Sequence, residues 1–324
     1  MRHSWLLAAT VVVAATLVAQ PSVVLAATPS TARERTSDRT APTPPRRPSG
    51  DFGELAHQFD YARRTIQVIE NGVERRGSVL VHDISYRAPG QDPVLAYLVE
   101  PSGGGRHPAT MWLHWLGEEH ADRTDFLDEA VQLADRSGLV SLLPQQVFPF
   151  DYGPVGDTRD RDAIIKQVIQ LRRGLDLLDQ RRNVDPQRVA LVGHDYGGMS
   201  GSIVAAVDRA RLRSTVLVAI DSTWGNWFVS FFLDLPQEQV VPYMALFDTL
   251  EPTAYLDHLP RGGLLFQFST NDFFIPNSIA DQITGSTATP HVVRKYDTDH
   301  AMELPAVEHD RDAFLITSLG ATHR

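Results

Sequence analysis

The chain has 324 residues, with 40 acidic and 30 basic side chains, a formal charge of −10 at neutral pH and no cysteine. Without cysteine, thiol catalysis, disulfide bonds and cysteine-based metal sites are excluded, so an exported form would depend on packing alone for its stability. The acidic excess repels polyanions, and we expect nucleic acid not to be a partner.

Residues 1–27 have the pattern of a secretory signal peptide. Arg2 and His3 precede an apolar run at 6–19, and small residues after Pro21 place the cleavage site behind Ala26 or Ala27. The alternative, a membrane anchor, is disfavoured because the run is shorter than the roughly 20 residues that span a bilayer. We therefore expect a secreted protein with no stable membrane insertion after cleavage.

Residues 28–50 predict a disordered linker. They are rich in Pro, Thr, Ser and Arg and contain few side chains that could enter a core. The remaining 51–324 carry 24 basic and 38 acidic residues, a net charge of −14. A segment of this length can bury a core of its own without disulfides, and we expect it to be one domain.

Short apolar runs alternate with helical patterns along this domain. The expected strands are 77–88, 93–100, 109–115, 139–145, 188–194, 214–220, 263–269 and 291–296, and the expected helices are 123–136, 159–181, 198–209, 276–285 and 305–319. The first two strands suit an antiparallel edge, and the rest predicts a doubly wound, mostly parallel α/β sheet covered on both faces. Ligands of such sheets bind beyond the carboxyl ends of the strands.

Residues 222–260 interrupt the alternation with an aromatic-rich stretch that is too long for an ordinary connection. We interpret it as a short helical lid that forms an apolar pocket wall; helices packed on the sheet edge are the alternative. The pocket candidates that it contributes are Trp224, Trp227, Tyr243 and Tyr255.

The segment Gly193-His194-Asp195-Tyr196-Gly197-Gly198 lies where a strand meets a helix. A nucleophile elbow requires glycines around its central residue, because that residue has strained backbone geometry and the strand and helix approach closely. Asp195 occupies the central position. The alternative is an aspartate that only caps the following helix.

These patterns resemble the α/β-hydrolase superfamily over residues 77–319. The elbow GHDYGG is similar to that of the epoxide hydrolase and haloalkane dehalogenase branch, whereas the segments 184–201 and 264–276 look like dienelactone hydrolase relatives, whose nucleophile is usually Cys or Ser. The resemblance implies an α/β-hydrolase fold and a hydrolase without a cofactor that acts on a small molecule.

The superfamily's chain order of nucleophile, acid and histidine implies a triad of Asp195, Asp272 and His300. The turn at 114–117 resembles the superfamily's His-Gly turn, with Trp115 in place of glycine. The backbone N–H groups of Leu116 and Tyr196 are then the candidate oxyanion donors. At the strand ends, the further pocket candidates are His114, Trp115 and Gln145.

An aspartate nucleophile suggests a particular electrophile. Asp195 is ordinarily ionised at neutral pH, and its attack on an acyl carbon gives a strained anhydride, whereas attack on a saturated carbon gives an ordinary ester that His300 and water can hydrolyse. We therefore expect a covalent alkyl-enzyme ester with an apolar, epoxide-like or halogenated molecule. An epoxide needs an acid, for which Tyr152, Tyr243 and Tyr255 are candidates; a halide needs donors such as Trp115. Tyr196 stands where the dehalogenases carry Trp, which favours the epoxide.

Three alternatives stay open. The first is an ester or lactone hydrolase of the dienelactone hydrolase type, in which His300 activates water directly. The second is a non-hydrolytic lyase, isomerase or cyclase, and the third is a binding protein with a decayed triad. Glu118, Glu119 and His120 lack a recognisable ligand spacing, so we expect a solvated loop there and no metal. The oligomeric state is open.

Overall fold

The computed structural model of the protein describes residues 51–116, 122–149 and 152–322. The predicted signal peptide, the predicted linker and the segment Glu118-Glu119-His120 lie outside these ranges. Within them, no helix combines the length and the apolar character that crossing a membrane requires.

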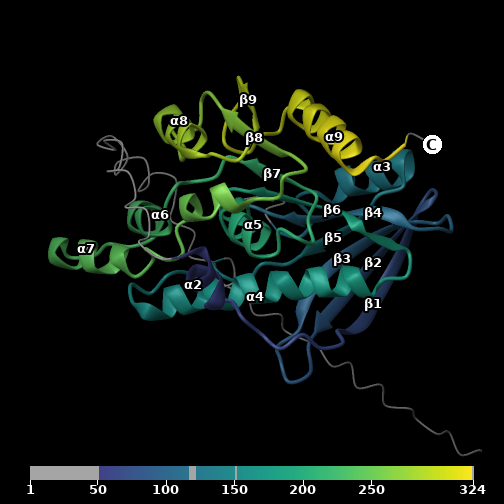
Figure 1. The fold of residues 1–324 in the computed structure, drawn as a ribbon, viewed down its shortest axis with the longest axis horizontal. Helices are drawn as coiled ribbons and strands as arrows, with labels where there is room; N and C mark the ends of the chain where they lie inside the picture. The colour runs from purple at the N-terminus through teal and green to yellow at the C-terminus, as the bar shows by residue number, and fades with distance from the viewer. Residues whose placement is uncertain (1–50, 117–121, 150–151, 323–324) are drawn as a thin grey trace, which may run out of the picture.

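A nine-stranded sheet forms the centre of the domain, with the strand order β1-β2-β3-β5-β4-β6-β7-β8-β9 (Figure 1). The strands are β1 Gln67–Arg76, β2 Val79–Arg87, β3 Val94–Pro101, β4 His107–Leu113, β5 Val140–Pro144, β6 Val184–His194, β7 Ser214–Val218, β8 Leu264–Ser269 and β9 Val292–Tyr296. Strand β1 pairs antiparallel with β2, β2 with β3, and β3 with β5. The remaining neighbours, β5 and β4, β4 and β6, β6 and β7, β7 and β8, and β8 and β9, pair parallel. This is the α/β-hydrolase fold that the sequence predicts.

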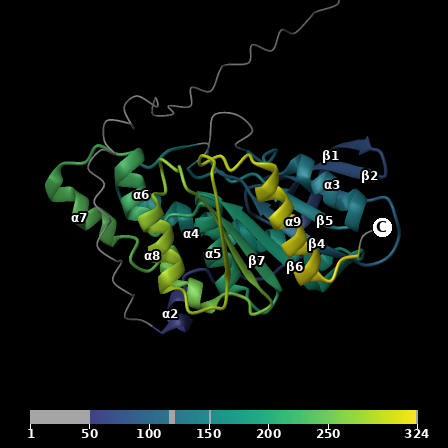
Figure 2. The ribbon, with the colours of Figure 1, turned by 90° about the horizontal axis from the view of Figure 1, so that it is seen from above.

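Helices cover both faces of the sheet (Figures 1 and 2). They are α2 Phe52–His57, α3 Leu127–Ser137, α4 Thr158–Gln180, α5 Tyr196–Val207, α6 Trp224–Phe231, α7 Gln237–Ala245, α8 Asn277–Ser286 and α9 Pro305–Leu319, with two 3-10 turns, η1 Pro252–Ala254 and η2 Leu256–His258. Helices α3 and α9 pack in the core layer on one face, and α4, α5 and α8 pack in the layer on the other.

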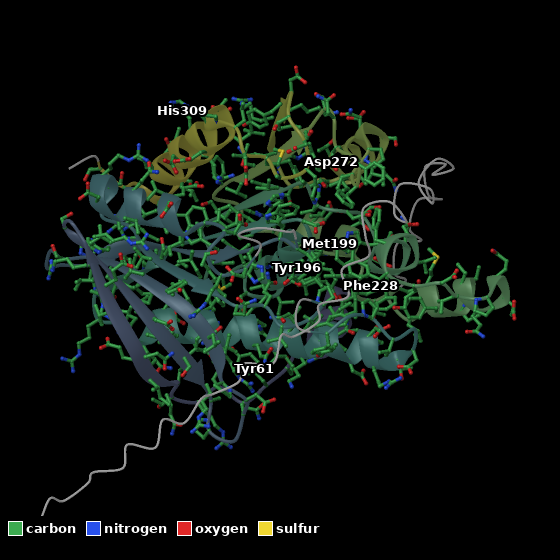
Figure 3. The ribbon with its side chains drawn as sticks, turned by 180° about the vertical axis from the view of Figure 1, so that it is seen from behind. Tyr61, Tyr196, Met199, Phe228, Asp272 and His309 are labelled. Atoms are coloured by element: carbon green, nitrogen blue, oxygen red, sulfur yellow. The ribbon has the colours of Figure 1, made fainter. Side chains whose placement is uncertain are left out.

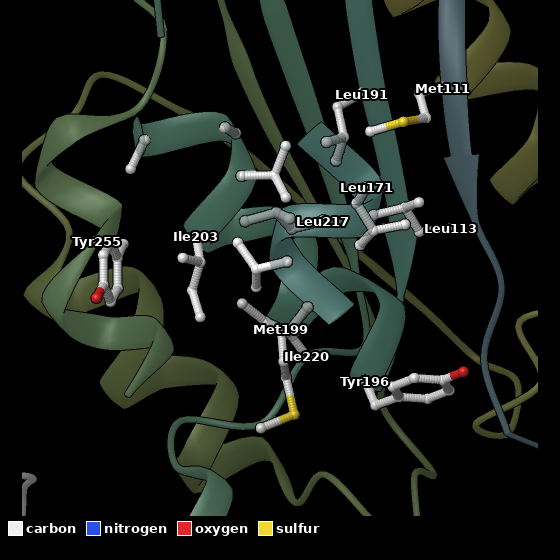
Figure 4. Close-up of a cluster of buried hydrophobic side chains, with 14 of the residues drawn as sticks. Met111, Leu113, Leu171, Leu191, Tyr196, Met199, Ile203, Leu217, Ile220 and Tyr255 are labelled. Carbon is white, nitrogen blue, oxygen red and sulfur yellow. The ribbon is translucent and has the colours of Figure 1, made fainter. Parts of the chain in front are cut away.

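Four of the parallel strands are buried along their whole length, because each is covered on both sides. Every residue of β4, β5, β7 and β8 is buried. Figure 4 shows Leu191 and Leu217 of the sheet beside Leu171 of α4 and Met199 and Ile203 of α5. This continuous apolar layer fixes the carboxyl ends of the parallel strands, where the chemistry is expected.

Two elements were not predicted from the sequence. Strand β1 is exposed along nearly all of its length and contains a bulge between Glu70 and Gly72, so it lacks the alternation by which a half-buried strand is recognised. Helix α2 has six residues, of which Leu55 is buried. Both are held by their neighbours in space and leave little periodic signal.

Candidate active site

Asp195 lies in a sharp turn between β6 and α5. Its backbone has φ 48° and ψ −123°, a conformation that a side chain other than glycine adopts only under strain. The Asp195 N–H donates to the carbonyl of Val218 at 2.8 Å, and the Asp195 carbonyl accepts from the N–H of Met199 at 2.9 Å. The strained turn is therefore fixed by strand β7 on one side and by helix α5 on the other.

The glycines around Asp195 are required by close backbone approach. A Cβ on Gly193 would lie 2.6 Å from the carbonyl oxygen of Gly197, and a Cβ on Gly197 would lie 2.4 Å from the carbonyl oxygen of His114. Neither can be accommodated without moving backbone. The elbow thus packs directly on the turn that follows β4.

His300 and Asp272 lie next to Asp195 at the same end of the sheet. The Nδ1 atom of His300 is 2.7 Å from Oδ2 of Asp272, and its Nε2 atom is 3.7 Å from Oδ1 of Asp195. Asp195 is 3% exposed and His300 is 5% exposed. The other oxygen of Asp272 accepts from the N–H groups of Phe274 and Ile275, each at 2.8 Å. Backbone amides thus orient Asp272, and Asp272 orients His300.

The charges around His300 favour its protonated form. Burial lowers the pKa of His300, but Asp272 and then Asp195 act in the opposite direction and raise it to about 10. The two carboxyl groups therefore favour the imidazolium form of His300 in the resting site.

His194, which was not predicted from the sequence to belong to the site, holds the backbone of His300 through a hydrogen bond. Its Nε2 donates to the backbone carbonyl of His300 at 2.9 Å. Burial, followed by the charge of His300, lowers the pKa of His194 well below its ordinary value, so His194 is neutral. Its position directly before Asp195 in the chain was the available signal.

Aromatic rings enclose the His300 imidazole. The ring centroids of Trp115 and Phe274 are 5.3 Å and 4.9 Å from that of His300, and Trp115 also stacks on His194 at 5.1 Å. In Figure 3 Tyr196 and Asp272 are drawn in one region with Met199, and His309 lies apart from them. The His309 side chain is 82% exposed, as expected for a surface residue.

The strand-end turn at 114–116 contributes Trp115 to this enclosure, and the Trp115 backbone N–H interacts with the Asp125 carboxyl. Burial raises the pKa of Asp125 to about 8 despite the nearby Arg311. Gln145, a predicted pocket residue, uses its side chain locally: it accepts from the N–H of Arg123 and donates to the carbonyl of Gln146. The residue that reaches the turn is Gln146, one position further along the chain.

Helix α6 brings two predicted pocket residues to the elbow. The rings of Trp227 and Tyr196 stack with centroids 6.1 Å apart, and Trp224 lies edge-on to Trp227 at 6.2 Å. The backbone N–H of Trp224 donates to the buried carboxyl of Glu251 at 2.6 Å. This bond anchors the start of α6 and holds an apolar wall beside the elbow.

Two tyrosines of the predicted lid donate their hydroxyl protons to other protein groups. The hydroxyl of Tyr243 donates to Asp160 at 2.7 Å, and that of Tyr255 donates to the carbonyl of Thr249 at 2.6 Å. Tyr255 lies by Ile203 of α5, at a distance from Tyr196 (Figure 4). Tyr243 lies in α7 and its partner Asp160 in α4, whereas Tyr255 lies in the segment after α7, which folds back against α5. Tyr152 is 49% exposed, and its ring lies 5.3 Å from that of Phe148.

No protein-family model matches the sequence, and no curated protein matches it. Solved structures do resemble the fold. An acetyl xylan esterase of Thermoanaerobacterium sp. JW/SL YS485 superposes with a TM-score of 0.66 at 15% identity, covering 89% of this chain and 98% of that one. An acetyl xylan esterase of Paenibacillus sp. R4 gives 0.59 at 17% identity, covering 82% and 91%. An S-formylglutathione hydrolase of Agrobacterium tumefaciens gives 0.58 at 13% identity, covering 78% and 98%. These similarities establish the α/β-hydrolase fold.

Proposed function

We propose that the protein is a hydrolase that forms a covalent alkyl ester on Asp195 with an apolar small molecule carrying an epoxide or a halogen on a saturated carbon. The observation that carries this proposal is the geometry of three buried side chains: the Asp195 carboxylate at the elbow, His300 at 3.7 Å from it, and Asp272 at 2.7 Å from His300. A carboxylate in this place needs no base before it attacks.

In the first step, an oxygen of Asp195 forms a bond to the saturated carbon, and the bond from that carbon to the leaving group breaks. A halide leaves with the electron pair as an anion. An epoxide oxygen takes the electron pair and then needs a proton. The hydroxyls of Tyr243 and Tyr255 donate to Asp160 and to the Thr249 carbonyl, and Tyr152 is the third tyrosine that the sequence suggests for this acid.

The second step follows from the loss of charge on Asp195. An ester at Asp195 is neutral, so one of the two carboxylates that raise the His300 pKa no longer acts, and His300 releases its proton more readily. Neutral His300 then takes a proton from water, and the hydroxide attacks the carbonyl carbon of the ester. The backbone N–H groups of Leu116 and Tyr196 are the proposed donors to the oxyanion. The ester bond to the alkyl oxygen breaks, that oxygen takes the proton from His300, and the alcohol leaves. The proton left on the Asp195 carboxyl then passes to His300, which restores the carboxylate and the protonated imidazole.

The test is a trapping experiment. A His300→Gln variant keeps the nucleophile and loses the base, so we expect the ester to accumulate when the variant is incubated with panels of epoxides, haloalkanes and esters. Peptide mass spectrometry should find the mass of the substrate's alkyl group on the peptide that contains Asp195. A double variant that also carries Asp195→Ala is the control and should stay unmodified. Unmodified His300→Gln protein, with a wild type that turns the same compound over, would contradict the covalent route.

The second candidate is an ester or lactone hydrolase in which His300 activates water directly. The esterase structures that share the fold favour it, but it requires neutral His300 in the free enzyme. We expect kcat/KM of the covalent route to vary little between pH 6 and pH 9, since Asp195 attacks while His300 is protonated. Direct water activation predicts a tenfold rise per pH unit toward the His300 pKa of about 10. A pH profile of kcat/KM distinguishes the two routes.

We also propose that the protein acts outside the cytoplasm, on the basis of the signal-like sequence at 1–27. N-terminal sequencing of the protein recovered from a secreting host should begin after Ala26 or Ala27. An N-terminus at Met1 would contradict this proposal.

A further inference from the structure

The turn that carries the proposed oxyanion donor Leu116 is held by two buried residues of neighbouring strands. His114 directly follows β4 and is 1% exposed, and Gln146 follows β5 and is 0% exposed. The carbonyl of His114 also packs on the elbow, close to where a Cβ on Gly197 would lie. A displacement of this turn would therefore also shift the elbow that contains Asp195.

The contacts between the two residues define the state of the His114 ring. The backbone N–H of Gln146 donates to Nε2 of His114 at 3.0 Å, and the Gln146 side-chain amide donates to the His114 carbonyl at 2.9 Å. A backbone N–H can only donate, so Nε2 must accept and the ring proton of a neutral imidazole must lie on Nδ1. That nitrogen is 2.9 Å from the carbonyl oxygen of Trp115, to which it donates.

This hydrogen bond sets the direction of the next amide. The Trp115 carbonyl and the Leu116 N–H belong to one planar trans peptide, in which the two groups point in opposite directions. Holding the carbonyl toward His114 therefore holds the N–H away from it. The preceding peptide is restrained as well, because the Trp115 N–H interacts with Asp125. The Leu116 donor is thus oriented before any charge develops.

We propose that His114 is a positioning residue for the oxyanion donor Leu116, and that Gln146 sets the tautomer in which His114 acts. This inference rests on the proposed function in two respects, the formation of an oxyanion at Asp195 and the role of the Leu116 N–H as a donor to it. Both ring nitrogens of His114, a predicted pocket residue, are engaged by the protein backbone.

The kinetic test compares two substitutions at His114, using the compound that the trapping panel identifies. Loss of one oxyanion donor costs roughly 100- to 1000-fold in kcat, and a donor that is only misdirected should cost less. We therefore expect His114→Leu to lower kcat about 10- to 100-fold with KM nearly unchanged. His114→Asn should restore most of kcat, since its amide nitrogen, like Nδ1, is bonded to Cγ and can donate to the Trp115 carbonyl.

The matched control is His107→Leu, which truncates a buried histidine at the other end of β4. It should alter stability as His114→Leu does while leaving kcat near the wild-type value. Equal losses of kcat in the two leucine variants, or no rescue by asparagine, would overturn the positioning role.

A spectroscopic readout on the wild type is independent of turnover and of whether a variant folds. Heteronuclear NMR of the ring nitrogens should show His114 protonated on Nδ1 and not on Nε2 from pH 6 to pH 9. A ring protonated on Nε2, or one that titrates in this range, would overturn the proposal. If no compound in the panel is turned over, the proposed function fails, and the ring tautomer still decides the arrangement inferred for His114 and Gln146.

Discussion

Asp195→Ala is expected to lower kcat by about 10⁴-fold or more on any compound that the wild type turns over. The substitution removes the atom that bonds to the substrate and leaves His300 paired with Asp272 alone. Since one of the two carboxylates that raise the His300 pKa is then absent, that pKa should fall toward its ordinary value. Steady-state kinetics, with the pH titration of His300 followed by NMR, measures both effects.

The control for this substitution is Asp234→Ala, which removes an exposed carboxylate between α6 and α7. It should leave kcat and the titration of His300 as they are in the wild type. The fold of Asp195→Ala should persist, because the backbone bonds to Val218 and Met199 do not involve the side chain. Full turnover by Asp195→Ala would refute the nucleophilic role and favour direct activation of water by His300.

Gly197→Ala is expected to lower the free energy of unfolding by about 3 kcal/mol or more. The added methyl group would lie 2.4 Å from the carbonyl oxygen of His114 and 2.6 Å from that of Leu113. Both are backbone atoms at the end of a buried strand, so they cannot move as a flexible side chain can. Either α5 or the turn after β4 must shift, and we expect turnover to be lost together with stability. Urea denaturation at equilibrium measures the change.

Gly285→Ala is the matched control, because it makes the same chemical change in helix α8 with nothing within 4 Å of the added methyl group. Alanine is the better helix former by up to about 1 kcal/mol, so this variant should be as stable as the wild type or more stable. If Gly197→Ala and the wild type had the same urea midpoint of unfolding, the inference that the elbow packs closely on the end of β4 would be wrong.

Patterns among residues that are neighbours in the chain predicted most of the fold. The parallel strands and the helices α3, α4, α5, α8 and α9 follow from runs of apolar residues and from helical periodicity, both of which are properties of neighbours in the chain. Strand β1 left no such signal, since almost all of its residues are exposed and it is held by pairing with β2. In the predicted lid, aromatic content did not distinguish Trp224 and Trp227, whose rings lie by the elbow, from Tyr243 and Tyr255, whose hydroxyls donate elsewhere.

The aromatic lid shows most clearly why side-chain direction could not be predicted. Trp227 stacks on Tyr196 beside Asp195, whereas Tyr255 turns its hydroxyl to Thr249 on the far side of α5. Both are buried aromatic residues of one predicted segment. Their roles differ because the chain reverses after α7, and this reversal cannot be predicted from the aromatic composition of the segment.

The sequence by itself determined that a carboxylate occupies a glycine-flanked bend between a strand and a helix, and that an acid and a histidine follow it in an order that parallel strands bring to one edge. Those features are set by residue types and by chain order. Only the tertiary structure decided which groups support them: His194 donates to the carbonyl of His300, and Gln146 donates to the carbonyl of His114 at the turn after β4. These contacts join residues at or beyond the ends of different strands. Such a hydrogen bond depends on side-chain rotation and on strand register to within a fraction of a residue spacing, and no local sequence pattern encodes either.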